Sequence, residues 1–163
     1  MNIHVRRPNH AEIDVLVNLA EQSPYQSVDE DGKRSLKQHL ETGRALIALA
    51  NGSPAGLLLF RSHIWDNRPP FVEHIDVADD HKRQGIGRAL MAGLERIAIQ
   101  EGYPAIYSST AEDNPESQRF HNELGFEVDC NYPLRDQKAV ELMLSKLVDP
   151  PIEIPDNVIL DVS

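Results

Sequence analysis

The sequence predicts a single α/β domain with a mixed central sheet of about six or seven strands flanked by about four helices. Three observations support this prediction. Asn51-Gly52 joins two apolar runs, as in an antiparallel hairpin. An amphipathic segment over 85–100 lies between two strand-like runs, as in a parallel crossover. The 163 residues fit one domain, since domains commonly have roughly 100 to 200 residues.

The N-terminal part predicts one strand and two helices. Residues 3–6 alternate like a short strand, and Asn9 with Glu12 resembles a capping box that opens a helix. Apolar residues then recur at helical spacing. A second helix is predicted over about 29–42, because Gly43 is typical of the residue that follows a helix end.

Three antiparallel strands are predicted next. Residues 45–50 and 55–60 flank the Asn51-Gly52 turn, and residues 71–77 alternate between apolar and polar side chains after a turn rich in Asp, Asn and Pro. These segments would form a meander.

The remaining segments alternate between helices and strands. They are a helix over 85–100, a strand over 105–110, a helix over 114–124, and strands over 126–130 and 139–147. The domain would span residues 1–148. Residues 149–163, which contain three prolines, predict an extended tail that packs on its own domain or on a partner subunit.

Composition excludes several classes of protein. With 16 basic and 26 acidic residues, the net charge of -10 disfavours nucleic acid and membrane partners and favours a cationic acceptor. No apolar run approaches the ~20 residues of a membrane span, and no signal peptide begins the chain, so we expect a cytoplasmic protein. The seven histidines are scattered and Cys130 is the single cysteine, so no metal site or internal disulfide is expected.

A glycine-rich basic loop lies between the strand over 71–77 and the next helix. Its residues are Lys82, Arg83, Gln84, Gly85, Ile86, Gly87 and Arg88. The two glycines let the backbone approach a ligand, and the first-turn amides and dipole of the helix attract anions. A diphosphate fits such a loop. A dinucleotide or triphosphate loop is disfavoured, because the third glycine and the Gly-Lys-Ser/Thr triplet are both missing.

At these residues the sequence resembles the GNAT N-acetyltransferase superfamily. Segment 82–87 resembles the family's Arg/Gln-x-x-Gly-x-Gly/Ala pyrophosphate loop, with Lys82 in place of Arg or Gln. Segment 114–126 resembles the family's Asn-containing helix that ends in Leu-Gly-Phe. The resemblance covers about residues 1–148. It implies a GNAT-like fold and an acyltransferase that moves the acetyl group of acetyl-CoA to a primary amine.

The resemblance also implies the cofactor site. Ile75 and Val77 would offer main-chain groups to the pantetheine arm, and residues 82–88 would bind the pyrophosphate. Asn114 would contact the pantetheine or only cap its helix, and Ser117 would reach the cofactor.

Acetyl transfer to an amine requires a proton acceptor, because an alkylammonium titrates near ~10.4. The resemblance makes Glu73, four residues before Val77, the first candidate for this base. Alternatively, Glu73 faces solvent or pairs with a cation. His74 and Asp76 have the opposite parity and would replace it if the strand bulges.

The leaving thiolate requires a proton donor. Many relatives carry a Tyr four residues before the Gly of Leu-Gly-Phe, and His121 occupies that position. An imidazole can donate a proton near pH 7. His121 would therefore be a general acid, or it would instead pack or contact the substrate. Cys130 has no evident His partner, so we expect buried packing and direct attack by the amine in a ternary complex.

The acceptor is expected to contact segments 24–31, 65–70 and 131–137, which carry Tyr25, Trp65 and Tyr132. A small cationic amine is favoured, and a peptide is the other candidate. The alternative functions are a protein lysine or N-terminal acetyltransferase and a non-catalytic acyl-CoA sensor. A homodimer is compatible with the sequence.

Overall fold

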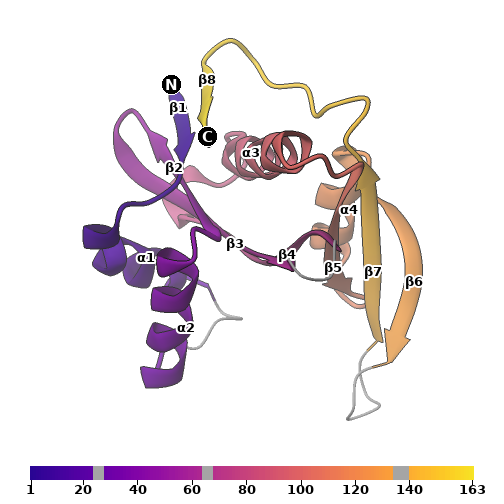
Figure 1. Ribbon diagram of the computed structural model, residues 1–163, viewed down its shortest axis with the longest axis horizontal. Helices are drawn as coiled ribbons and strands as arrows, with labels where there is room; N and C mark the ends of the chain where they lie inside the picture. The colour runs from indigo at the N-terminus through magenta and orange to yellow at the C-terminus, as the bar shows by residue number, and fades with distance from the viewer. Residues whose placement is uncertain (24–27, 64–67, 134–139) are drawn as a thin grey trace.

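The computed structural model describes residues 1–23, 28–63, 68–133 and 140–163. Within these residues the chain forms one mixed sheet of eight strands in the order β6-β7-β5-β4-β3-β2-β1-β8 (Figure 1). The strands are β1 (Ile3–Arg6), β2 (Ala45–Ala50), β3 (Ser53–His63), β4 (Arg68–Val77), β5 (Ala105–Ala111), β6 (Glu127–Pro133), β7 (Val140–Leu147) and β8 (Val158–Asp161). The α-helices are α1 (Ile13–Ala20), α2 (Glu30–Glu41), α3 (Ile86–Gln100) and α4 (Pro115–Glu123), and short 3-10 helices precede α1 and α3 as η1 (His10–Glu12) and η2 (Asp79–His81).

The predicted hairpin and crossover are both present. Asn51 and Gly52 have φ angles of 48° and 85°, so both central residues of the turn are left-handed, as the type I′ turn of a two-residue hairpin requires. β2, β3 and β4 form the antiparallel meander. β4 and β5, which α3 connects, are parallel. The α/β class with a mixed sheet is therefore confirmed.

The first helix begins as predicted but in two stages. Asn9 accepts a hydrogen bond from the Ala11 amide through Oδ1, and its own amide donates to Glu12 Oε2 at 2.7 Å. This capping box starts η1, and α1 continues from Ile13. Asp29 caps α2 in a similar way, because its Oδ1 accepts from the Gly32 amide at 2.9 Å.

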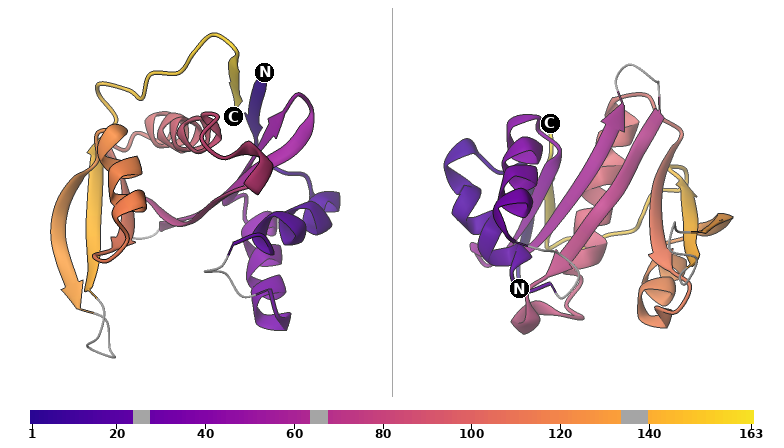
Figure 2. Two further views of the ribbon diagram at one scale, coloured as in Figure 1. Left: turned by 180° about the vertical axis from the view of Figure 1, so that it is seen from behind. Right: turned by 90° about the horizontal axis from the view of Figure 1, so that it is seen from below.

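The sheet separates two apolar cores. α1 and α2 cover one face, where Leu16 and Leu36 pack against Leu57 and Leu59 of β3. α3 lies on the other face (Figures 1 and 2). One face of β4 therefore lies toward α1 and α2 and the other toward α3. This arrangement determines toward which helices the polar side chains of β4 project.

None of the described helices combines the length and the apolar character that crossing a membrane requires.

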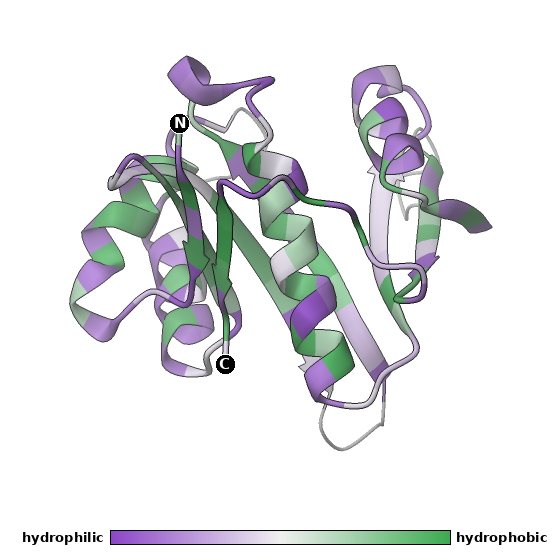
Figure 3. Ribbon diagram, turned by 90° about the horizontal axis from the view of Figure 1, so that it is seen from above, coloured by the Kyte–Doolittle hydropathy of each residue, from purple (hydrophilic) through white to green (hydrophobic). Residues whose placement is uncertain are grey.

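The tail contributes an eighth strand that the sequence did not predict. β8 pairs in parallel with β1, with Ile3 opposite Val158. The tail crosses over α3 to reach this position (Figure 3). Val162 is 1% exposed and packs near Gly93 of α3, where a Cβ would lie 3.5 Å from the valine side chain. The sheet consequently has one strand more than the predicted upper number.

A buried ion pair anchors the start of the tail. Lys146 Nζ on β7 lies 2.6 Å from Glu95 Oε2 on α3, and their side chains are 7% and 3% exposed. Lys146 also donates to the carbonyl oxygen of Pro150, and the Ile152 amide donates to Glu95 Oε1 at 2.6 Å. The tail therefore satisfies two buried charges that the domain alone would leave incompletely bonded.

The expectation that Cys130 is buried was wrong, since its side chain is exposed. β6 is the edge strand of the sheet, and its register shifts between Val128 and Cys130. Val128 is 59% exposed. Apolar residues in a strand are buried only where other elements cover the strand. β6 lies at the edge of the sheet and is not fully covered.

Candidate active site

The sheet opens between its two parallel central strands. Phe71 of β4 pairs with Tyr107 of β5, and no further pair of this ladder occurs within the described residues. The strands β5 to β7 run at a steep angle to β3 and β4 in Figure 1. Beyond Phe71, the edge of β4 that faces β5 is therefore available to another partner.

The hydrogen-bonding pattern identifies which residues present main-chain groups at this edge. The Ala78 amide donates to the Ala55 carbonyl oxygen at 2.8 Å, on the β3 side. Neighbouring residues in an antiparallel ladder point to opposite sides. The N–H and C=O groups of Ile75 and Val77 therefore point away from β3, toward β5. Both predicted pantetheine contacts lie on the open edge.

The glycine-rich loop follows β4 after the short helix η2. Gly85 is the residue before α3 and has a φ angle of 86°, a left-handed conformation that favours glycine. No side chain caps the helix, and its first turn contains no acidic residue. The first amides of α3 are consequently left for an external acceptor. Lys82 lies 2.7 Å from Asp79, and Arg83 and Gln84 are exposed.

The other loop residues have different surroundings. Ile86 is 1% exposed and belongs to the core, so only its main chain faces the loop. A Cβ at Gly87 would lie 3.1 Å from the ring of Phe120 on α4, so this glycine permits a close helix approach. Arg88 donates to the Glu153 carbonyl oxygen at 3.2 Å. Its guanidinium thus contacts the tail.

Asn114 caps α4, the capping alternative of the two roles considered for it. Its Oδ1 accepts from the Ser117 amide at 3.1 Å. The Ser117 carbonyl oxygen lies 2.8 Å from His121 Nδ1, one turn further along the helix. The three predicted residues of this helix are therefore linked to one another by hydrogen bonds.

His121 is buried between α4 and the strands. Its exposed fraction is 3%, and its ring makes edge contacts with Phe120 and Phe126 at centroid distances of 5.4 and 5.1 Å. Burial lowers the pKa of His121, against a smaller opposing effect of the Ser117 carbonyl. The ring is therefore neutral at physiological pH.

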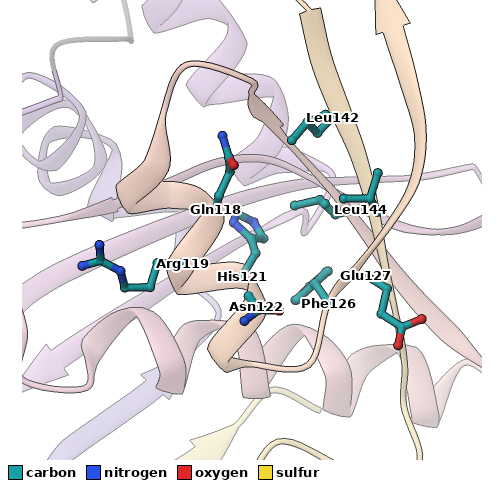
Figure 4. Close-up of a pocket in the computed structure, with 9 residues that line it drawn as sticks. Gln118, Arg119, His121, Asn122, Phe126, Glu127, Leu142 and Leu144 are labelled. Atoms are coloured by element: carbon teal, nitrogen blue, oxygen red, sulfur yellow. The ribbon is translucent and has the colours of Figure 1, made fainter.

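A groove of about 580 Å³ lies beside His121, between α4 and the strands β6 and β7. Figure 4 shows His121 and Phe126 between α4 and the leucines Leu142 and Leu144 of β7. Ile75, Val77 and the glycine-rich loop do not line this groove. Its position therefore separates it from the open edge of β4.

Glu73 lies in a bulge of β4. Leu59 of β3 pairs with His74 and Phe60 pairs with Val72, so Glu73 is the extra residue between them. Its Oε2 lies 2.6 Å from His39 Nε2 on α2, and its Oε1 lies 2.5 Å from Arg61 Nε on β3. Of the roles considered for Glu73, the cation-paired arrangement is the one observed.

The pair has shifted pKa values in opposite directions. Burial alone would raise the pKa of Glu73, but the hydrogen bond from His39 and the charges of His39, Arg61 and His74 outweigh it, and the pKa is lowered. The hydrogen bond to Glu73 raises the pKa of His39, although burial opposes it. Each side chain therefore favours the charged form of the other.

Asp76 lies on the same face of β4 as this pair. In the pairing of β4 with β3, Asp76 lies opposite Leu57 and His74 lies opposite Leu59. Both leucines belong to the core beneath α1 and α2. The Oδ2 atom of Asp76 is buried, with no hydrogen-bond partner among the described residues. Burial raises the pKa of Asp76, against smaller effects of Ser23 and His74.

Sequence reasoning did not identify His39 and Arg61. The helical spacing of His39 three residues after Leu36, on the buried face of α2, was an available signal. The expected acceptor contacts Tyr25 and Trp65 lie outside the described residues, as do 24–27, 65–67 and 134–137 of the expected segments. The structure does not describe the side chain of Tyr132.

The profile of the acetyltransferase (GNAT) family matches residues 8–126, and the chain belongs to this family. The match includes β4, the glycine-rich loop and α4. No curated protein matches the chain in sequence.

Solved structures of this family share the fold. A GNAT acetyltransferase from Bacillus cereus has a TM-score of 0.74 at 20% identity, covering 89% of this chain and 96% of its own. A ribosomal-protein-alanine N-acetyltransferase from Brucella melitensis has a TM-score of 0.70 at 20% identity, with 88% and 98% covered. The PaiA N-acetyltransferase from Thermoplasma acidophilum, solved with coenzyme A, has a TM-score of 0.70 at 15% identity, with 90% and 99% covered.

Proposed function

We propose that the protein is an acetyl-CoA-dependent N-acetyltransferase that acts on a primary amine, with a small cationic amine as the favoured acceptor. One observation carries this proposal. The uncapped N-terminus of α3 adjoins the open edge of β4, where Ile75 and Val77 present main-chain groups. A diphosphate joined to an extended amide-containing arm matches both features.

The chain's own groups fit coenzyme A. Main-chain amides of residues 85–88 would bind the diphosphate, with Lys82 and Arg83 supplying positive charge nearby. Ile75 and Val77 would pair with the pantetheine amides as a strand pairs with its neighbour. Ser117 would approach the arm from α4, and Asn114 would position the first turn of that helix by capping it.

Bound acetyl-CoA would supply a thioester as the activated acetyl group. The Val77 amide, on the open edge, would stabilise the negative charge that develops on the carbonyl oxygen during attack. The amine would approach from the α1 and α2 face, where Glu73, His74 and Asp76 lie. Carboxylates on that face and a net charge of -10 favour a cationic acceptor.

Two measurements test the proposal. Calorimetry with acetyl-CoA should give saturable binding, and its absence would exclude the assignment. Thiol release from acetyl-CoA should then depend on an added amine from a panel of spermidine, kanamycin, an alanine-terminated peptide and an internal-lysine peptide.

The panel also separates the alternatives. Turnover with spermidine or kanamycin supports a small-amine enzyme, whereas turnover restricted to the peptides indicates a protein acetyltransferase. Tight binding of acetyl-CoA without turnover on any amine would instead identify a non-catalytic sensor. Mass spectrometry of the product should show the gain of one acetyl group.

A further inference from the structure

The bulge at Glu73 changes which side chains of β4 share a face. Without it, Glu73 would project opposite to His74 and Asp76, because side chains of a regular strand alternate. The bulge shifts Glu73 onto the α2 side, where it contacts His39. Glu73, His74 and Asp76 consequently all border the side from which an acceptor would approach.

These residues differ in how much hydrogen-bonding capacity remains. Both oxygens of Glu73 are occupied, one by His39 at 2.6 Å and the other by Arg61 at 2.5 Å. A carboxylate with two cationic partners is a weak base, because protonation would forfeit both interactions. Glu73 is therefore poorly suited to accept a proton from a substrate.

Asp76 has the opposite properties. Its Oδ2 is buried and lacks a partner among the described residues, while its side chain also bonds with Ser23 after α1. A buried carboxylate oxygen without a donor is costly, so a donor supplied by the acceptor would be favourable. Burial raises the pKa of Asp76 and makes it a stronger base than an ordinary aspartate.

Position also separates the two carboxylates. Asp76 immediately precedes Val77, whose amide points to the open edge, whereas Glu73 lies three residues further back. At roughly 3.3 Å per residue, the two Cα atoms are about 10 Å apart along the strand. A nitrogen that attacks a carbonyl bound at Val77 is therefore nearer to Asp76.

We propose that Asp76, rather than Glu73, is the catalytic residue that binds the acceptor's ammonium group and removes its proton. This inference rests on the proposed acetyl transfer. The His39–Glu73–Arg61 cluster acts as a charge-compensated group that positions α2 against β4. On β4, Glu73 and His74 share the face of Asp76, and the charge of His74 acts on it; Ser23, which follows α1, bonds with its side chain.

The proposed step balances in atoms and charge. Asp76 takes one proton from the ammonium, and the freed lone pair of the nitrogen forms the C–N bond with the acetyl carbon. The C–S bond breaks and its electrons stay on sulfur. The second nitrogen proton is transferred to that sulfur, and Asp76 returns its proton to solvent, so one proton is released per amide formed.

The experiment compares Asp76→Asn with Asp14→Asn, which makes the same chemical change at an exposed position of α1. Thiol release from acetyl-CoA is measured with the same four amines, across pH. We expect Asp76→Asn to lower kcat at least about 100-fold and to abolish the acidic limb of the pH–rate profile. Acetyl-CoA affinity should stay at the wild-type value, and Asp14→Asn should match the wild type throughout.

Stability provides a readout that a structural role would not give. Because burial disfavours the charged form of Asp76, Asp76→Asn should leave the Tm unchanged or raise it. Wild-type kcat and an unaltered acidic limb in Asp76→Asn would overturn the inference alone. A lowered Tm with weakened acetyl-CoA binding would overturn it in favour of a structural residue. Absence of turnover by the wild type with every amine would overturn the proposed function and this inference together.

Discussion

Ser108 donates a hydrogen bond from its hydroxyl to Nε2 of His121, at 2.8 Å. The direction follows from the other ring nitrogen. Nδ1 faces the Ser117 carbonyl oxygen, which can only accept, so Nδ1 carries the proton of the neutral ring. Both nitrogens of His121 are therefore engaged within the protein, and the contacts favour packing over proton donation to a leaving thiolate.

His121→Gln tests this interpretation. Loss of the ring contacts and of one buried hydrogen bond should lower the free energy of unfolding by about 1–3 kcal/mol. The kcat of the folded variant should fall less than about 3-fold, whereas loss of a general acid would cost roughly 100-fold or more. Urea denaturation and thiol-release kinetics measure the two effects separately. A large loss of kcat at unchanged stability would restore the catalytic role.

Lys146→Met should strongly destabilise the protein. The substitution removes the cation from a buried pair and leaves Glu95 charged between α3 and the tail. Such changes typically cost about 3–5 kcal/mol. Urea denaturation measures the loss.

The double variant Lys146→Met with Glu95→Leu provides the comparison. It should recover much of that loss because no unpaired charge remains. Recovery should be incomplete, since the Ile152 amide loses its acceptor. Full recovery would show that the tail contact with Glu95 contributes nothing.

The His39–Glu73 pair predicts a pH-dependent stability. Because the pKa of His39 is raised in the folded protein, its interactions add to the free energy of unfolding. This stabilisation is complete below about pH 6.5, the pKa of His39 in the unfolded chain, and is lost as the pH rises through the pKa of the folded protein. The lowered pKa of Glu73 gives a second stabilisation, which is present above about pH 4.3 and is lost as the pH falls through the pKa of Glu73 in the folded protein. Wild type should therefore exceed His39→Gln in stability most between about pH 4.3 and about pH 6.5. A difference that is constant with pH, measured by urea denaturation, would contradict the ion pair.

Gly87→Asp should abolish acetyl-CoA binding. The new side chain would place a carboxylate beside the uncapped amides of α3, and its Cβ would press on Phe120. Gly87→Asn has nearly the same shape without the charge and is the matched control. Calorimetry should show weakened but measurable binding by Gly87→Asn. Equal losses in the two variants would mean that steric displacement of Phe120, not charge, prevents binding.

Local sequence signals predicted most of the fold. The hairpin at Asn51-Gly52 and the caps at Asn9 and Asn114 depend on residues close together in the chain, and each appears as a hydrogen bond or a left-handed turn. β8 was missed because its four residues acquire strand character only by pairing with β1. Whether such a short segment forms a strand depends on its tertiary contacts more than on the β propensity of its residues.

The site was predictable to the extent that it uses the main chain. Ile75 and Val77 came from the resemblance to the GNAT family, and Gly85 from the glycine-rich loop that matches it; the structure gives Gly85 a φ angle of 86° and places Ile75 and Val77 opposite Leu58 and Gly56 of β3. The bulge at Glu73 has no local signature, so the shared face of Glu73 and Asp76 could not be deduced from the sequence. His39, which pairs with Glu73, comes from α2, and no local sequence pattern indicates that this helix packs beside β4.

The parallel pairing of β1 with β8 has a consequence for synthesis. β8 is the last of the described strands in sequence order, so the outer edge of β1 stays unpaired until β8 has been made and takes its place. An exposed strand edge is a template for pairing with other chains. During synthesis this edge of β1 is therefore open to intermolecular strand addition until β8 pairs with it.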